Sequence, residues 1–195
     1  MRRLGTRERA PASISELIPG FTPENELESR VVQSPELLEG LAWGRPRPGH
    51  PEGPVAAHVA DLLERLERMN EPPERRSMLR FIILVHDAFK NKVQEWRPRT
   101  GENHHATRAR RFAERFTDDE RLLTTIECHD RPYGIWRKWK RTGKLDEERL
   151  EQFIDRLPDP DLFMDFVELD GSTEGKKPEP IAWFRDELRK RRPAG

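Results

Sequence analysis

Apolar residues recur at intervals of three and four along most of this chain, and this spacing restricts what the chain can fold into. One such stripe contains Val55, Val59, Leu62, Leu63 and Leu66. Apolar positions at this spacing fall on one face of an α-helix. The alternating pattern that predicts β-strands is confined to pieces too short for a sheet. We therefore expect an all-α protein.

Prolines and glycines divide these stripes into successive helices. A helix start is clearest at Ser34-Pro35-Glu36, where an N-cap residue precedes a proline at the first helical position. With ends uncertain by about two to four residues, we expect helices at 34–41, 54–69, 74–90, 104–116, 118–129, 133–141, 145–157, 160–170 and 180–191. We expect a single helical domain over residues 48–195, with residues 1–47 forming an N-terminal arm and short helices packed on it.

The composition excludes several classes of protein. The 195 residues include 36 Lys plus Arg and 36 Asp plus Glu, so the net charge is zero. This balance makes nucleic acid an unlikely partner, although a local basic patch is not excluded. The single cysteine, Cys128, allows neither an internal disulfide nor a thiolate cluster. No stretch has the length and apolarity of a signal peptide core or a membrane span, so we expect a cytoplasmic protein without a membrane partner.

Several histidines and aspartates interrupt the apolar stripes and are predicted to point inward. They are His58, His86, Asp87, His105, His129 and Asp170. A buried imidazole or carboxylate without a partner costs several kcal/mol. One inward histidine alone is more often a hydrogen-bonded core residue than a ligand. Six such residues in one short domain favour a shared metal site.

Other polar residues near these six are less clearly placed by the pattern. The stripe of His104 runs through Thr107, Arg108 and Arg111, which predicts a solvated face and places His104 at the rim of the site. Asp130 is predicted to hydrogen-bond to a metal ligand or to a water and so to orient it, without itself binding the metal. The alternative is that Asp130 simply ends a helix. His50 lies in a Gly-Pro-rich loop, where shaping the turn is the favoured role over lining the site.

The segment His86-Asp87-Ala88-Phe89-Lys90 resembles the namesake motif of the HD superfamily of metal-dependent phosphohydrolases. The order of the other inward residues, with one histidine before the doublet and two histidines and an aspartate after it, also fits. The lead-in 49–55 with His58 is similar to the HD portion of bacterial tRNA nucleotidyltransferases. The resemblance covers roughly residues 48–175 and implies an HD-domain helical bundle.

The resemblance also implies how the metal ligands divide. His58, His86, Asp87 and Asp170 would hold one metal, and His105 and His129 would complete a second site, with Asp87 bridging. Some departures matter: Ala88-Phe89 replaces the leucine-glycine often found in the motif, and no Gly-Tyr-Pro signature accompanies His104-His105. The cyclic-dinucleotide phosphodiesterase branch is therefore not supported. The nucleotidyltransferase head domain and the alarmone hydrolase-synthetase architecture are missing.

We therefore expect a phosphohydrolase that cleaves a phosphomonoester or phosphodiester, of a nucleotide or related small metabolite, by attack of hydroxide formed at the metal. Nitrogen and oxygen ligands without sulfur suit one or two ions of iron, manganese, nickel, cobalt or zinc. Asp87 and Lys90 are the predicted catalytic residues. The candidates for binding substrate phosphate are Lys90, Arg108, Arg131 and Lys176.

Two alternatives remain open at this point. Tyr133, Trp136 and Trp139 are interleaved with lysines and arginines, a pattern that suits either base stacking or aromatic core packing. If they bind bases, the chain is a non-catalytic RNA-binding module. The other alternative is a diiron oxygenase on the same scaffold. Lys90 favours phosphate chemistry over this alternative.

Overall fold

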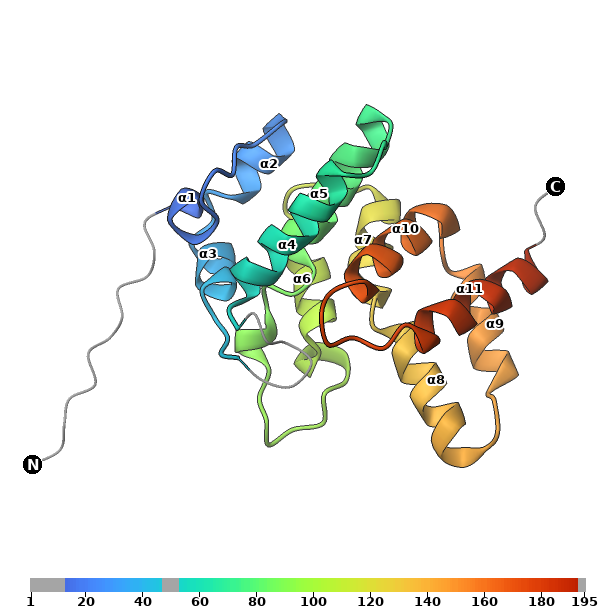
Figure 1. The fold of residues 1–195 in the computed structure, drawn as a ribbon. Helices are drawn as coiled ribbons and strands as arrows, with labels where there is room; N and C mark the ends of the chain where they lie inside the picture. The colour runs from blue at the N-terminus through green and yellow to red at the C-terminus, as the bar shows by residue number, and fades with distance from the viewer. Residues whose placement is uncertain (1–12, 47–52, 193–195) are drawn as a thin grey trace, which may run out of the picture.

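A computed structural model describes residues 13–46 and 53–192, and the regular secondary structure of these residues is helical (Figure 1). The described residues contain no β-strand, which confirms the predicted all-α class. The α-helices are α1 (Ile14–Leu17), α2 (Glu26–Val31), α3 (Pro35–Leu41), α4 (Val55–Glu67), α5 (Pro73–Val85), α6 (His105–Ala113), α7 (Glu120–Cys128), α8 (Arg131–Thr142), α9 (Glu147–Asp155), α10 (Pro160–Gly171) and α11 (Glu179–Arg191). Two 3₁₀ turns, η1 (Lys90–Lys92) and η2 (Gly101–Asn103), lie between α5 and α6.

The centre of the bundle consists of α4, α5, α7 and α10, which pack against one another. Helix α10 contacts each of the other three, α5 also contacts α4 and α7, and α6 lies along α7. The predicted stripe on α4 is buried here, with Val59 and Leu62 fully enclosed. Helix α11 packs on α8 and α10 at one end of the bundle (Figure 1). The central helices are therefore held on several sides, which fixes the direction of their ends.

One predicted helix is shorter than expected, and the difference lies at the His-Asp doublet. The segment expected to be helical over 74–90 ends at Val85, and a turn and η1 follow. His86 caps α5, and its ring Nδ1 lies 3.0 Å from the carbonyl oxygen of Ile83. The side chain thus satisfies a backbone acceptor that the helix end leaves free. The expectation that Asp87 and Lys90 share a continuous helix was wrong.

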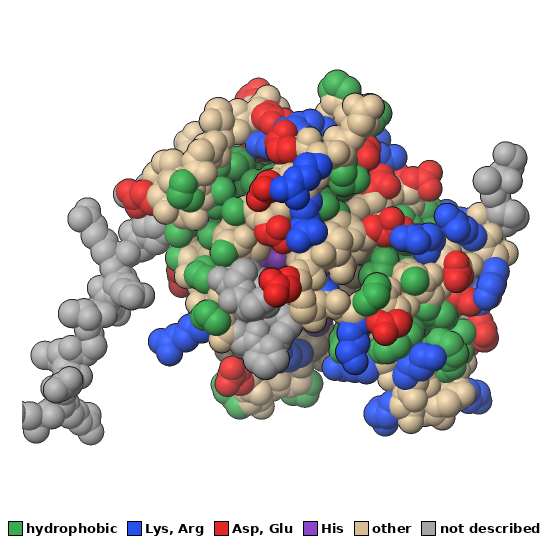
Figure 2. Space-filling model, in the orientation of Figure 1, with side chains coloured by type: hydrophobic (Ala, Val, Ile, Leu, Met, Phe, Trp, Pro, Cys, Tyr) green, Lys and Arg blue, Asp and Glu red, His purple; other side chains and the backbone are tan. Residues whose placement is uncertain are grey.

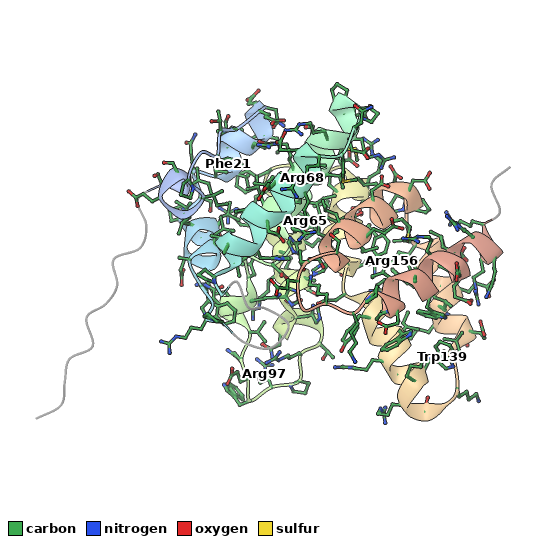
Figure 3. The ribbon with its side chains drawn as sticks, viewed as in Figure 1. Phe21, Arg65, Arg68, Arg97, Trp139 and Arg156 are labelled. Carbon is green, nitrogen blue, oxygen red and sulfur yellow. The ribbon has the colours of Figure 1, made fainter. Side chains whose placement is uncertain are left out.

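The N-terminal residues that the structure describes are tied to the bundle by a buried ion pair. Glu28, on α2, is fully buried and accepts hydrogen bonds from Arg80 Nε at 2.8 Å and Nη2 at 2.9 Å. The Glu24 amide also donates to Glu28, at 2.9 Å. The ring of Phe21, labelled in Figure 3, lies 5.3 Å from the Arg80 guanidinium. Residues 13–46 are therefore integrated with α5.

Replacing Glu28 by Ala is expected to lower the free energy of unfolding by about 3–5 kcal/mol, because it leaves the Arg80 guanidinium buried without its main counter-charge. Urea denaturation followed by circular dichroism measures the change. Glu26→Ala is the matched control, because Glu26 is exposed on the same helix and its loss should change stability by about 0.5 kcal/mol at most. Similar values for the two variants would contradict the structural role of the pair.

The surface carries no dominant charge of one sign on the face seen in Figure 2. Lysine and arginine side chains are interspersed there with aspartates and glutamates, as expected for equal numbers of the two. Among the helices of the described segments, none is both long and apolar enough to cross a bilayer. Selective binding must therefore come from local arrangements of side chains rather than from the overall charge.

Candidate metal centre

The six predicted metal ligands come from five helices, and all six meet in the middle of the bundle. His58 lies on α4, His86 and Asp87 directly follow α5, His105 begins α6, His129 directly follows α7, and Asp170 lies in the last turn of α10. Five of the six are buried, and the Asp170 side chain is 17% exposed. Only a small area of histidine is visible near the middle of the face in Figure 2.

A first group of donor atoms surrounds the Nε2 atom of His86. Asp87 Oδ2 lies 3.5 Å from this nitrogen, and Asp170 Oδ1 lies 3.8 Å from it. His58 Nε2 lies 2.9 Å from the same Asp170 oxygen. One donor atom each from His58, His86 and Asp87 fall within 4.8 Å of one another. Such a group has the size and chemistry of a site for one transition-metal ion.

A second group lies on the other side of Asp87. His105 Nε2 is 3.2 Å from Asp87 Oδ1, and His129 Nε2 is 3.7 Å from the same oxygen. The two imidazole nitrogens are 3.4 Å apart. Donor atoms of Asp87, His105 and His129 again all lie within 4.8 Å of one another. Asp87 thus directs one carboxylate oxygen toward each group.

Two of the imidazoles are oriented by the helix ends that carry them. His86 Nδ1 bonds to the carbonyl of Ile83 at 3.0 Å, and His129 Nδ1 bonds to the carbonyl of Ile126 at 2.8 Å. A carbonyl only accepts, so each Nδ1 must carry a proton and donate it. This tautomer leaves Nε2 as the nitrogen that faces the cluster with its lone pair, as a metal ligand requires. Phe166 packs edge-on against His86, with the ring centres 5.1 Å apart.

The strongest indication of a missing partner is the Nε2 atom of His86. This nitrogen is buried and makes no hydrogen bond within the described residues. Its nearest acidic oxygens, at 3.5 and 3.8 Å, lie beyond ordinary hydrogen-bond length. Buried polar atoms of native proteins are almost always satisfied. A cation held between His86, Asp87 and Asp170 would satisfy it, and the donor set fits that cation.

The charges at the cluster suit a cation as well. Burial disfavours charge on the Asp87 carboxyl, yet the Lys90 ammonium and His86 hold its pKa well below the usual value. The same holds for Asp170, where burial is outweighed by Lys176 and His58. Burial lowers the pKa of His86, so its imidazole is neutral at pH 7. For His129, burial is outweighed by Asp130 and Asp87, which raise its pKa to about 9, so a metal ion at its Nε2 would have to displace a proton.

Sulfur takes no part in the cluster. Cys128 is fully buried next to His129 along the chain, but it belongs to none of the donor groups of the described residues. Burial raises the pKa of its thiol, and a protonated thiol is a poor ligand. The donors are therefore imidazole and carboxylate only, as the sequence predicts.

Of the four side chains predicted to bind substrate phosphate, two reach the cluster and two do not. Lys90 bonds to Asp87 Oδ2, and Lys176 Nζ lies 2.5 Å from Asp170 Oδ1. Both line a cavity of about 370 Å³ over the cluster. Arg108 and Arg131 line neither this cavity nor a larger neighbouring one. The Arg131 guanidinium lies 6.0 Å from the Phe153 ring instead.

His104 and Asp130 lie where the sequence predicts, at the edge of the cluster. Asp130 Oδ2 is 3.3 Å from His105 Nε2, and its side chain is 49% exposed. His104 stacks on His105 with the ring centres 4.7 Å apart, and its Nδ1 accepts from the Ala106 amide. Donor atoms of His104, His105 and Asp130 also lie within 4.8 Å of one another. His50 lies outside the described residues.

The aromatic residues of α8 divide between packing and exposure. Trp139 packs on Trp183 of α11 with the ring centres 5.6 Å apart, and Figure 3 labels it beside α8. The Lys140 ammonium covers the Trp139 ring at 4.2 Å. Tyr133 is 47% exposed and lines both cavities next to the cluster. Trp139 is therefore a partly buried residue packed against α11, whereas Tyr133 is exposed.

Sequence reasoning did not identify Gly40 as part of the support of the site. Gly40 lies on α3, and a Cβ atom placed on it would fall 1.6 Å from the carbonyl oxygen of Ala88. The backbone of α3 therefore packs directly on the turn that carries Asp87. A signal was available, because glycine inside a helix is unfavourable and calls for a packing reason. Lys177, which lines the small cavity, offered no comparable signal.

Comparisons with known proteins add nothing to this geometry, because no family model, no curated protein and no solved structure matches the chain. What the fold and the site define is therefore limited to a class: an all-α protein with a buried histidine–aspartate cluster that is able to hold metal.

Proposed function

We propose that this protein is a metal-dependent phosphohydrolase of the HD type that acts in the cytoplasm. The observation that carries the proposal is the position of Asp87 between two donor groups. Its Oδ2 faces His86, and its Oδ1 faces His105 and His129. Asp87 could serve ions in both donor groups, and two ions held there would stabilise both the attacking and the leaving oxygen of a phosphoryl ester. The order of the ligands along the chain, which resembles that of the HD superfamily, supports the same proposal.

A divalent transition ion bound here would make water a nucleophile at neutral pH and would neutralise charge on the phosphoryl oxygens. The chain supplies the other requirements. Asp87 and Asp170 provide negative charge that attracts the cation. Asp130, half exposed at the edge of the cluster, is placed to accept a proton from an attacking water. His86 and His129 are held in one ring orientation by their helix ends.

The cavity over the cluster is suited to a phosphate. Lys90, Lys176 and Lys177 line it, and Lys90 and Lys176 already contact the carboxylates of the cluster. Ammonium groups in a partly enclosed cavity bind phosphoryl oxygens and stabilise the charge that develops on them. A water attacks phosphorus from the side of the donor groups, and these lysines hold the non-bridging oxygens. The substrate is a phosphate ester of a nucleotide or a related metabolite.

The two alternatives receive less support. An RNA-binding module would use the aromatic residues of α8, but Trp139 is engaged with Trp183 and Lys140. A diiron oxygenase would use the same ligands, but it has no need of three lysines around its cavity. Phosphate chemistry accounts for both the donor groups and the lysines.

Purified protein supplied with iron, manganese, nickel, cobalt or zinc is expected to hold one to two ions per chain, measured by mass spectrometry of the metal. Binding should also raise the melting temperature, because a ligand at 100 times its Kd stabilises the folded state by about 2.7 kcal/mol. For a chain of this size that corresponds to a shift of roughly 5–11 °C. Chelation should reverse the shift and stop hydrolysis of bis(p-nitrophenyl) phosphate. Protein that takes up none of the five metals would contradict the proposal.

A further inference from the structure

Two neighbouring cavities border the histidine–aspartate cluster. The smaller, of about 370 Å³, reaches Asp87 and His129, and the larger, of about 900 Å³, reaches His105. Both are lined by the same three residues, Lys90, Asp130 and Tyr133. Both volumes fall in the range of ordinary ligand-binding pockets, roughly 300–1,000 Å³. A ligand held at these three shared residues therefore has separate space on each side.

We infer that the substrate is a phosphodiester whose nucleoside occupies the larger cavity. The inference rests on the proposed function and narrows it. A phosphomonoester has one carbon-bearing substituent on phosphorus and needs one cavity beside the metal ligands. A phosphodiester has two such substituents, and the two cavities provide for both, with phosphorus next to Lys90 and Asp130.

The larger cavity has walls suited to a planar aromatic ring. Tyr133 is 47% exposed and Trp43 is 39% exposed, and both line it. The Arg137 guanidinium lies over the Tyr133 ring, 5.5 Å from its centre, and Trp136 stacks on the same ring with the ring centres 6.4 Å apart. Nucleobases stack on aromatic side chains and on guanidinium groups. The exposed part of the Tyr133 side chain is the surface on which such a ring would stack.

The polar groups of the larger cavity favour a nucleotide over an uncharged aromatic ligand. Arg99 and Arg137 line it, and neither forms an ion pair within residues 13–46 and 53–192, although most arginines there do. Glu95 is the opposing charge besides Asp130. The arginines are suited to phosphate oxygens.

The smaller cavity is suited to the departing group. Its lining includes the apolar residues Val167, Pro180 and Ile181 besides the lysines. In the reaction, the oxygen of water forms a bond to phosphorus while the bond from phosphorus to the ester oxygen on this side breaks. The electron pair stays on that ester oxygen, which takes up a proton derived from the water. The products are a nucleoside monophosphate in the larger cavity and an alcohol in the smaller one.

Three esters tested on the metal-loaded full chain separate the possibilities. They are the p-nitrophenyl ester of thymidine 5′-phosphate, methyl p-nitrophenyl phosphate and thymidine 5′-phosphate. We expect kcat/KM for the first to exceed that for the second by about tenfold or more, as base stacking allows. Equal values for the two diesters would overturn the inference but leave the proposed function intact. Faster hydrolysis of the monoester would also overturn it. Failure of all three esters to react would overturn both.

Arg137→Ala tests the larger cavity with little risk to folding, because Arg137 is exposed. We expect the preference for the thymidine diester over the methyl diester to fall about tenfold, and the affinity for thymidine 5′-phosphate, measured by calorimetry, to fall by a similar factor. Arg141→Ala is the matched control, since Arg141 is exposed one turn further along α8 and lines neither cavity. Equal preferences and affinities in the two variants would overturn the assignment of the nucleoside to this cavity.

Discussion

Asp87→Asn is expected to lower kcat/KM for bis(p-nitrophenyl) phosphate by about 10³-fold or more and to abolish stable metal binding. Asn keeps the volume of Asp but removes the charge that both donor groups share. A catalytic metal supplies several kcal/mol of transition-state stabilisation, and each 1.36 kcal/mol is tenfold in rate. Initial rates and metal content per chain measure the two effects. Circular dichroism establishes that the variant is folded, because the change also deprives Lys90 of its partner.

The matched control is Asp61→Asn. Asp61 lies on α4, forms an ion pair with Arg65 on the following turn, and has a side chain that is 38% exposed. A surface pair of this kind contributes little to stability, so rate and metal content should stay within about twofold of wild type, a difference of about 0.4 kcal/mol. Wild-type activity in Asp87→Asn would remove the shared carboxylate from the mechanism. Equal losses in both variants would show a general effect on folding.

The positions of the ligands were predictable because burial on a helix is a local property. His58 and Asp170 are 112 residues apart in the chain, yet each could be assigned to the inner face from its own apolar neighbours. Agreement among five separate stripes, one of which carries both His86 and Asp87, then indicated one site. The expectation that the six residues converge came from the resemblance and not from the periodicity, and in the structure they lie next to one another.

The residues around the cluster were less predictable, for physical reasons. Arg108, Arg131 and Lys176 were similar candidates in the sequence, and only Lys176 reaches the cluster. It comes from the segment between α10 and α11, whose course depends on packing and not on periodicity. The end of α5 at Val85 was also missed, because the apolar pattern continues into His86 while the imidazole competes for the last carbonyls.

Gly40→Ala is expected to destabilise the fold by about 3 kcal/mol or more, at or above the upper end of the usual cost of overpacking. The new Cβ would lie 1.6 Å from the Ala88 carbonyl oxygen and 2.6 Å from its carbon. Both are backbone atoms, so no side-chain rotation relieves the contact. Either α3 or the turn after α5 must move, and Asp87 lies on that turn. Metal affinity should therefore fall together with stability.

The matched control is Gly134→Ala, for which we expect a change in stability of the opposite sign. Gly134 is also helical, and a Cβ there would meet nothing within 4 Å. Gly134→Ala should therefore stabilise the protein by about 0.5–1 kcal/mol, the ordinary result of replacing glycine inside a helix. Urea denaturation of both variants gives the comparison. If Gly40→Ala were stabilising too, α3 would not pack on the turn that carries Asp87, and the N-terminal helices would have no part in positioning the metal centre.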